Sequence, residues 1–149
     1  MSETTSSETL VLKRTYHAEP ERVFRAWIVR ADLERWYTPG EGWEVRVEEH
    51  DARPGGRSTV VFGPHGELPY VEVTTYLEIS SPSLLRFTTH LTHGDEVVAD
   101  TECRVEFRSV TTGTEVVMNE TGYPPERMAE RHQGWSETLD HLHPVVEAG

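Results

Sequence analysis

The sequence contains a single cysteine, Cys103, in 149 residues, and it has no long apolar run. One thiol cannot form a disulfide within the chain, which fits a protein of a reducing compartment. No apolar stretch approaches the roughly 18 residues that a membrane-spanning helix needs. The N-terminal stretch MSETTSSETL has neither the basic nor the apolar segment of a secretory signal. These absences predict a soluble, cytoplasmic protein.

Positive charge is also scarce, because 14 Lys and Arg stand against 26 Asp and Glu, for a formal net charge of −12. Nucleic acids and anionic membranes are bound through basic surfaces. The acidic excess does not identify a basic partner, since acidic surfaces commonly serve solubility. We therefore predict no nucleic-acid partner and no membrane partner.

The short motifs of metal, nucleotide and nucleophile sites are absent. The sequence has no HExxH, CxxC, GxSxG, GxGxxG or P-loop pattern. Eight histidines are present, but His141 and His143 are two residues apart, which does not place them on one helix face. Cys103 alternates with Val105 and Phe107, which favours an inert, packed thiol. The sequence therefore predicts no metal site and no cofactor.

The most regular stretch lies near the C-terminus, between Pro124 and Glu147. Large residues recur there at spacings of four, three, four, three and four: Met128, His132, Trp135, Leu139, Leu142 and Val146. This spacing draws one stripe along an α-helix. The opposite face is expected to carry charged residues: Glu126, Arg127, Glu130, Arg131, Glu137 and Asp140. Such an amphipathic helix needs an apolar surface against which its stripe can pack.

The preceding chain is mainly typical of short strands. A strand at 10–17 is followed by two short helices, one beginning at Pro20 and one at 31–37. Further strands are expected at 43–50, 58–62, 69–79, 84–92, 97–109 and 114–121. Turn residues separate them, which favours antiparallel hairpins. The order predicts an α+β fold with an antiparallel sheet, as a single domain over residues 10–149 after a flexible tail at 1–9.

Side-chain alternation predicts how the strands face. Alternation on several strands indicates one packed and one solvated sheet face. In the stretch 69–79, it groups on one face the residues Val71, Val73, Leu77 and Ile79.

Four stretches, in this order, carry a resemblance to a known family. They are Pro20–Trp36 (PERVFRAWIVRADLERW), Asp51–Arg57 (DARPGGR), Tyr76–Thr88 (YLEISSPSLLRFT) and His132–Leu142 (HQGWSETLDHL). The chain resembles the START-like (SRPBCC) superfamily and, within it, the activator of heat-shock protein 90 ATPase homologue family. The resemblance implies the helix-grip fold, in which a curved antiparallel sheet of about six to seven strands wraps around a long C-terminal helix. Two short helices follow the first strand in that fold.

The resemblance also implies a mostly apolar cavity between sheet and helix, open near the two short helices. The candidate ligand-binding residues are Trp36, Trp43, Phe62, Tyr70, Phe87, Met128, His132 and Trp135. His132 is the best single candidate for a proton-transfer group, since it lies on the apolar stripe. Gly134, inside the helix, is expected to permit close approach of helix and sheet.

The leading functional hypothesis is a cavity protein that binds a small hydrophobic molecule. One alternative is a cyclase- or dehydratase-type enzyme acting on an aromatic or polyketide-like substrate. Arg53, Glu78 and Glu120 are polar candidates for its acid–base work, but their spacing gives no reason for them to meet. A further alternative is a module that contacts a chaperone, as the family name suggests. A homodimer through a sheet edge or the helices stays open.

Overall fold

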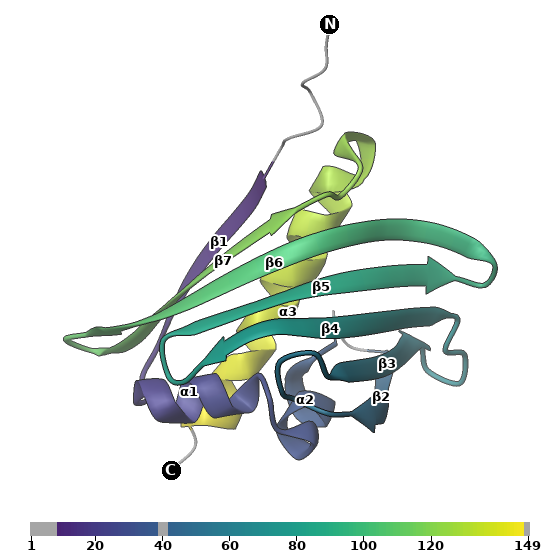
Figure 1. The fold of residues 1–149 in the computed structure, drawn as a ribbon. Helices are drawn as coiled ribbons and strands as arrows, with labels where there is room; N and C mark the ends of the chain where they lie inside the picture. The colour runs from purple at the N-terminus through teal and green to yellow at the C-terminus, as the bar shows by residue number, and fades with distance from the viewer. Residues whose placement is uncertain (1–8, 39–41, 148–149) are drawn as a thin grey trace, which may run out of the picture.

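Seven antiparallel strands form one curved sheet, and the long C-terminal helix lies across its concave face (Figure 1). The computed structural model describes residues 9–38 and 42–147. The strands are β1 (Thr9–Tyr16), β2 (Trp43–His50), β3 (Arg57–Pro64), β4 (Tyr70–Ser80), β5 (Leu84–His93), β6 (Glu96–Val110) and β7 (Gly113–Thr121). Their spatial order is β1-β7-β6-β5-β4-β3-β2. The predicted α+β helix-grip architecture is thereby confirmed.

Two short helices, α1 (Pro20–Ala26) and α2 (Arg30–Trp36), connect β1 to β2, as predicted. Pro20 occupies the first turn of α1, where its missing N–H is no loss. The C-terminal helix α3 (Met128–Glu147) follows a 3₁₀ turn, η2 (Pro125–Arg127). The helix therefore starts four residues after the expected Pro124. Residues 1–8 of the predicted tail lie outside the described residues, and Thr9 begins β1.

The central strands face as their alternation predicts. Leu85 and Phe87 of β5 are buried together with Cys103, Val105 and Phe107 of β6. The other face of the same strands carries charged side chains that pair across the sheet. Arg86, for example, donates to Glu102 at 3.1 Å. One sheet face is thus packed and the other is polar, which is the usual division in an antiparallel sheet.

On β4, the side chains that face the core are not the ones that the apolar pattern predicts. Its buried residues are Glu72, Thr74 and Tyr76. Val71 and Val73 are half-buried and Leu77 is exposed, whereas Ile79, which follows a register shift between Tyr76 and Glu78, packs against the core. Hairpin register explains the reversal, because Thr74 pairs with the buried Thr89 of β5, and Glu72 pairs with the buried Leu91. Glu72 is tolerated inside because it finds polar partners there, as described below.

The core is divided into a larger and a smaller part. The larger part includes Phe24 of α1, Trp36 of α2, Phe107 of β6 and the C-terminal half of α3, where Leu139 and Leu142 are fully buried. The smaller part is formed by Leu91, Val98, Ala99 and Tyr123. It lies toward the N-terminal end of α3, since the half-buried Met128 packs against both parts.

Candidate ligand-binding cavity

A cavity of about 330 Å³ opens between the sheet and the N-terminal half of α3. Its size falls at the lower end of the roughly 300–1,000 Å³ that small-molecule sites occupy. The residues that line it come from the C-terminal cap of α2, from β2 to β5, from the segment before η2, and from α3. They are Tyr37, Trp43, Phe62, Tyr70, Glu72, Leu91, Tyr123, Glu130, Arg131, Gly134, Trp135 and Thr138.

Three aromatic rings from neighbouring strands form one wall of the cavity. Phe62 of β3 and Tyr70 of β4 are directly paired in register, and their rings stack with centroids 5.2 Å apart and planes at 10°. The indole of Trp43 on β2 lies 5.9 Å from the Tyr70 ring, also stacked. Side chains two residues apart on a strand share a face, so the β2–β3 pairing of Val45 with Phe62 brings Trp43 to the same side. The wall is flat and apolar.

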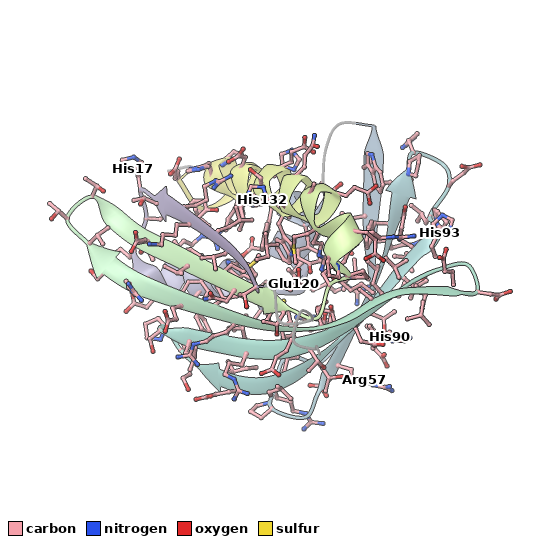
Figure 2. All side chains as sticks on the ribbon, turned by 90° about the horizontal axis from the view of Figure 1, so that it is seen from above. His17, Arg57, His90, His93, Glu120 and His132 are labelled. Atoms are coloured by element: carbon pink, nitrogen blue, oxygen red, sulfur yellow. The ribbon has the colours of Figure 1, made fainter. Side chains whose placement is uncertain are left out.

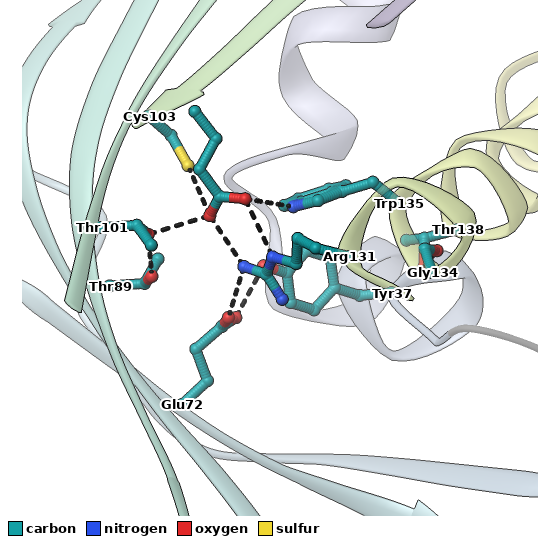
Figure 3. A network of polar contacts seen from close by, with 10 residues as sticks. Tyr37, Glu72, Thr89, Thr101, Cys103, Arg131, Gly134, Trp135 and Thr138 are labelled. Atoms are coloured by element: carbon teal, nitrogen blue, oxygen red, sulfur yellow. Dashed lines mark hydrogen bonds and ion pairs between the residues drawn. The ribbon is translucent and has the colours of Figure 1, made fainter. Parts of the chain in front are cut away.

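An ion pair between sheet and helix forms the polar end of the cavity (Figure 3). Arg131 of α3 donates from Nε to Oε1 of Glu120 at 2.8 Å and from Nη2 to Oε2 at 2.7 Å. Glu120, on β7, is 0% exposed and also accepts hydrogen bonds from the Trp135 indole at 3.2 Å and the Thr101 hydroxyl at 2.8 Å. Cys103 Sγ lies 3.4 Å from the same carboxylate. Every oxygen of Glu120 is therefore well supplied with donors.

A second buried carboxyl, Glu72, is less completely bonded. The Tyr37 hydroxyl donates to Glu72 Oε1 at 2.7 Å. The other oxygen, Oε2, lies 3.6 Å from Arg131 Nη2, beyond hydrogen-bond distance. Glu72 is 2% exposed and lines the cavity, so this oxygen is positioned to receive a donor from a molecule inside it.

The two carboxyl groups are driven in opposite directions by their surroundings. Burial raises the pKa of Glu72 above its ordinary 4.5, against the opposing charge of Arg131. Burial by itself would also raise the pKa of Glu120. The charge and hydrogen bonds of Arg131, together with the hydrogen bond from Thr101, outweigh this effect, so the pKa of Glu120 is lowered. Of the two carboxyl groups, Glu72 therefore takes up a proton more readily than Glu120.

Four of the predicted site residues line the cavity: Trp43, Phe62, Tyr70 and Trp135. Two others belong to the packed core. Trp36 is fully buried and donates its indole N–H to the Ala26 carbonyl at 2.9 Å. Phe87 borders a separate void of about 20 Å³.

The predicted position of His132 inside the cavity is wrong, because this residue is exposed on α3 (Figure 2). Met128 packs beside the cavity without lining it. The inward stripe of α3 instead begins at Arg131 and continues through Trp135 and Thr138, so Arg131 was wrongly assigned to the outer face. The pairing of Arg131 with Glu120 sets this rotation, since a buried carboxylate requires a cation or a proton.

A signal for the ion pair exists in the sequence. Glu120 shares the parity of Val116 and Met118 on β7, and all three are buried. An acidic residue on a packed face needs a basic partner, and Arg131 lies one helical turn before Trp135. Glu72 gives no comparable signal, because its neighbours of the same parity are Thr74 and Tyr70.

Gly134 has a different role from the one expected. A Cβ placed on it would meet no atom within 4 Å, so the residue does not serve close approach of helix and sheet. Gly134 instead borders the cavity, and its missing side chain leaves that space open.

Two other findings bear on the site. Among residues 9–38 and 42–147, no three His, Cys, Asp or Glu side chains are grouped so that they could hold a metal ion. None of the helices in the same ranges combines the length and apolar character needed to cross a membrane.

Known proteins resemble this chain in fold and, in part, in sequence. A protein of Chromobacterium violaceum is 27% identical, with a TM-score of 0.85 over 95% of this chain and 99% of that one. Proteins of Rhizobium leguminosarum (23% identity, TM-score 0.82, 96% of each chain) and Arthrobacter aurescens (20%, 0.83, 97% of this chain and 92% of that one) share the fold. No curated protein matches the sequence significantly.

The family assignment comes from the sequence itself. A family model described as activator of Hsp90 ATPase homolog 1-like protein matches residues 17–147. This range includes both short helices, β2 to β7 and α3. The chain therefore belongs to the activator of Hsp90 ATPase homolog 1-like family.

Proposed function

We propose that this protein binds one small, largely apolar molecule in the cavity between β2–β4 and the N-terminal half of α3. The observation that carries the proposal is the cavity of about 330 Å³, which has a stacked aromatic wall and no side chain at position 134 to fill it. Trp43, Phe62, Tyr70 and Trp135 are the proposed contacts for the apolar body of the ligand. The proposal includes that the protein is soluble and located in the cytoplasm.

The space beside Gly134 provides a test. Gly134→Leu places a side chain into the open volume, whereas Gly134→Ala leaves most of it free. We expect the wild type and Gly134→Ala to bind 1-naphthalenemethanol, a neutral flat probe, in calorimetric titrations. Gly134→Leu should lose at least about tenfold in affinity while melting no lower than the wild type, since leucine is a better helix former than glycine.

Native mass spectrometry of the purified protein complements the titration, because a co-purified small molecule should be present in the wild type and depleted in Gly134→Leu. Equal binding by all three proteins would place the site elsewhere. The absence of both probe binding and a co-purified molecule would refute the proposal.

Acid–base catalysis is a second candidate, favoured by the convergence of Tyr37, Glu72 and Arg131 in the cavity. Glu72 replaces His132 as the proton-transfer candidate, because the cavity holds Glu72 and His132 is exposed. The test is exchange of the α-protons of an enolisable aryl ketone in heavy water, followed by NMR. Exchange that disappears in Glu72→Gln would support an enzyme, and exchange no faster than in buffer would exclude this reaction.

A chaperone-contact surface has less support. The exposed large apolar residues of the described ranges are Val11, Leu77, Val97 and Val110. They lie on three different strands, β1, β4 and β6. Scattered apolar residues of this kind are ordinary on protein surfaces and indicate no docking site.

A further inference from the structure

The polar end of the cavity has more acidic than basic groups. Glu72 and Glu120 both lie within 4 Å of Arg131, at 3.6 Å and 2.7 Å, so two carboxyls share one guanidinium. Glu130 also lines the cavity, at its exposed side. The cavity lining and the adjoining Glu120 therefore supply three acidic side chains and one basic side chain. The electrostatic potential in the cavity favours a positive charge over a negative one.

Arg131 is already paired with a carboxylate, so it is a poor receptor for an anionic ligand. Its Nε and Nη2 are held by the two oxygens of Glu120. The faces of its guanidinium lie over the rings of Tyr123 and Trp135, at 4.9 Å and 5.5 Å from their centroids. An anionic ligand would approach a guanidinium whose charge is already balanced by Glu120, a carboxylate that is 0% exposed and fixed by four side chains. It would also lie close to the second carboxyl, Glu72, so its binding is unfavourable.

Glu72 is the group that remains incompletely bonded. It is 2% exposed, and among the described residues its Oε2 is met by Arg131 alone, as an ion pair at 3.6 Å that is too long for a hydrogen bond. This oxygen can therefore accept a hydrogen bond from a ligand in the cavity that it lines. The donor that suits a carboxylate best is a charged N–H, since such bonds are shorter and stronger than neutral ones.

The aromatic side chains favour the same chemistry. Tyr37 and Trp135 border the cavity edge-to-face at 5.7 Å, and the stacked rings of Trp43, Phe62 and Tyr70 form the wall. Ring faces attract organic cations and also bury flat apolar groups. A ligand with an apolar body and a cationic head would match both parts of the cavity.

We propose that the cavity selects a protonated amine carried on a flat, apolar body, with the ammonium N–H groups donating to Glu72. This inference rests on the proposed ligand-binding function and specifies the class of ligand. Tyr37 is a positioning residue in this arrangement, because its hydroxyl holds the Glu72 carboxyl by Oε1 and leaves Oε2 directed at the ligand.

Three probes of one shape test the charge preference on the wild-type protein: 1-naphthylmethylamine, 1-naphthalenemethanol and 1-naphthoate. Calorimetric titrations at neutral pH should rank the amine first, by about tenfold or more over the alcohol, and the carboxylate last. An alcohol that binds as well as the amine, or a carboxylate that binds better, would overturn the inference and leave the ligand-binding function standing. Failure of all three to bind, together with the absence of a co-purified molecule, would refute the binding function itself.

Two matched variants separate Glu72 from the overall negative charge. Glu72→Gln keeps the shape and an acceptor for Tyr37, and should bring the amine and alcohol affinities to within about threefold of each other. Glu102→Gln removes one charge from the outer sheet face and should keep the full preference. An equal loss of preference in both variants would assign the effect to net charge and overturn the inference. If Glu72→Gln does not fold, the ranking of the three probes on the wild type still decides.

Discussion

Arg131 and Glu120 join helix to sheet through two parallel hydrogen bonds, at 2.8 Å and 2.7 Å. The pair lies beside the cavity, in the half of α3 that packs on the core through Met128 and Trp135. Both groups are buried, with side chains 13% and 0% exposed. A buried pair of this kind need not stabilise the fold relative to an apolar pair, but the loss of one partner leaves a charge stranded.

Arg131→Met is therefore expected to lower the free energy of unfolding by about 3–5 kcal/mol, because Glu120 loses the cation that pairs with it. The double variant Arg131→Met with Glu120→Gln should recover a substantial part of that loss, since the stranded charge is gone. Urea unfolding of the two single variants and the double variant measures the coupling. Additive losses would show that the two residues do not act as a pair.

The raised pKa of Glu72 should be visible in the pH dependence of the free energy of unfolding. Burial raises its pKa above 4.5 in the folded protein, so the folded state holds a proton that the unfolded chain has released. Stability from this group is full below pH 4.5 and declines as the pH rises through the folded pKa. Glu72→Gln removes this decline. Melting curves from pH 4.5 upward should show the variant gaining on the wild type, and parallel curves would contradict the raised pKa.

Glu120 should act in the opposite sense. Its pKa is lowered in the folded protein, so its contribution is present above pH 4.5 and is lost as the pH falls below that value. The difference in free energy of unfolding between Glu120→Gln and the wild type should therefore be smaller under acidic conditions than near neutral pH. Chemical unfolding at pH 3 and pH 6 provides the comparison, and a larger difference at pH 3 would contradict the assignment.

Gly134→Ala should raise the free energy of unfolding by up to about 1 kcal/mol. Alanine is the better helix former, and the added Cβ meets nothing within 4 Å. The measurement is urea unfolding without ligand. A destabilised variant would mean that the helix interior at this position is not open.

Cys103 is expected to resist thiol reagents in the native protein. Burial, reinforced by the neighbouring negative charge of Glu120, raises the pKa of this thiol well above its ordinary value, and its side chain is 0% exposed. Native protein should react with iodoacetamide only at the rate of global opening, whereas protein in urea should react at once. Rapid native labelling, followed by intact-mass measurement, would contradict the burial of Cys103.

Local signals were enough to predict the order of the elements. The limits of β2 are those expected from the alternation of Trp43, Val45 and Val47, and the turns between later strands were predicted from Gly and Pro. These features depend on residues close in sequence. The start of α3 was misplaced because Pro124 leads into a 3₁₀ turn that begins at Pro125, and the α-helix starts only after this turn.

Half of the predicted site residues line the cavity, and the polar end was missed. Aromatic residues such as Phe62 and Tyr70 were assigned to the cavity through the family resemblance, since the alternation of β4 grouped Val71 and Val73 on the opposite face. The burial of Arg131 could not be predicted from helix periodicity, since a charge is placed by partners that are distant in sequence. Glu72 lies 59 positions before Arg131, and only the folded sheet brings them together.

The two halves of α3 are held in place by different means. Leu139, Leu142, Val145 and Val146 anchor the C-terminal half in the core, whereas the N-terminal half borders the cavity and is held by Met128, Trp135 and the ion pair. Amide hydrogens of the first turns should therefore exchange with solvent faster than those after Leu139. Transient fraying at this end would give a ligand a route into the cavity without unfolding the rest, and a bound ligand should slow that exchange.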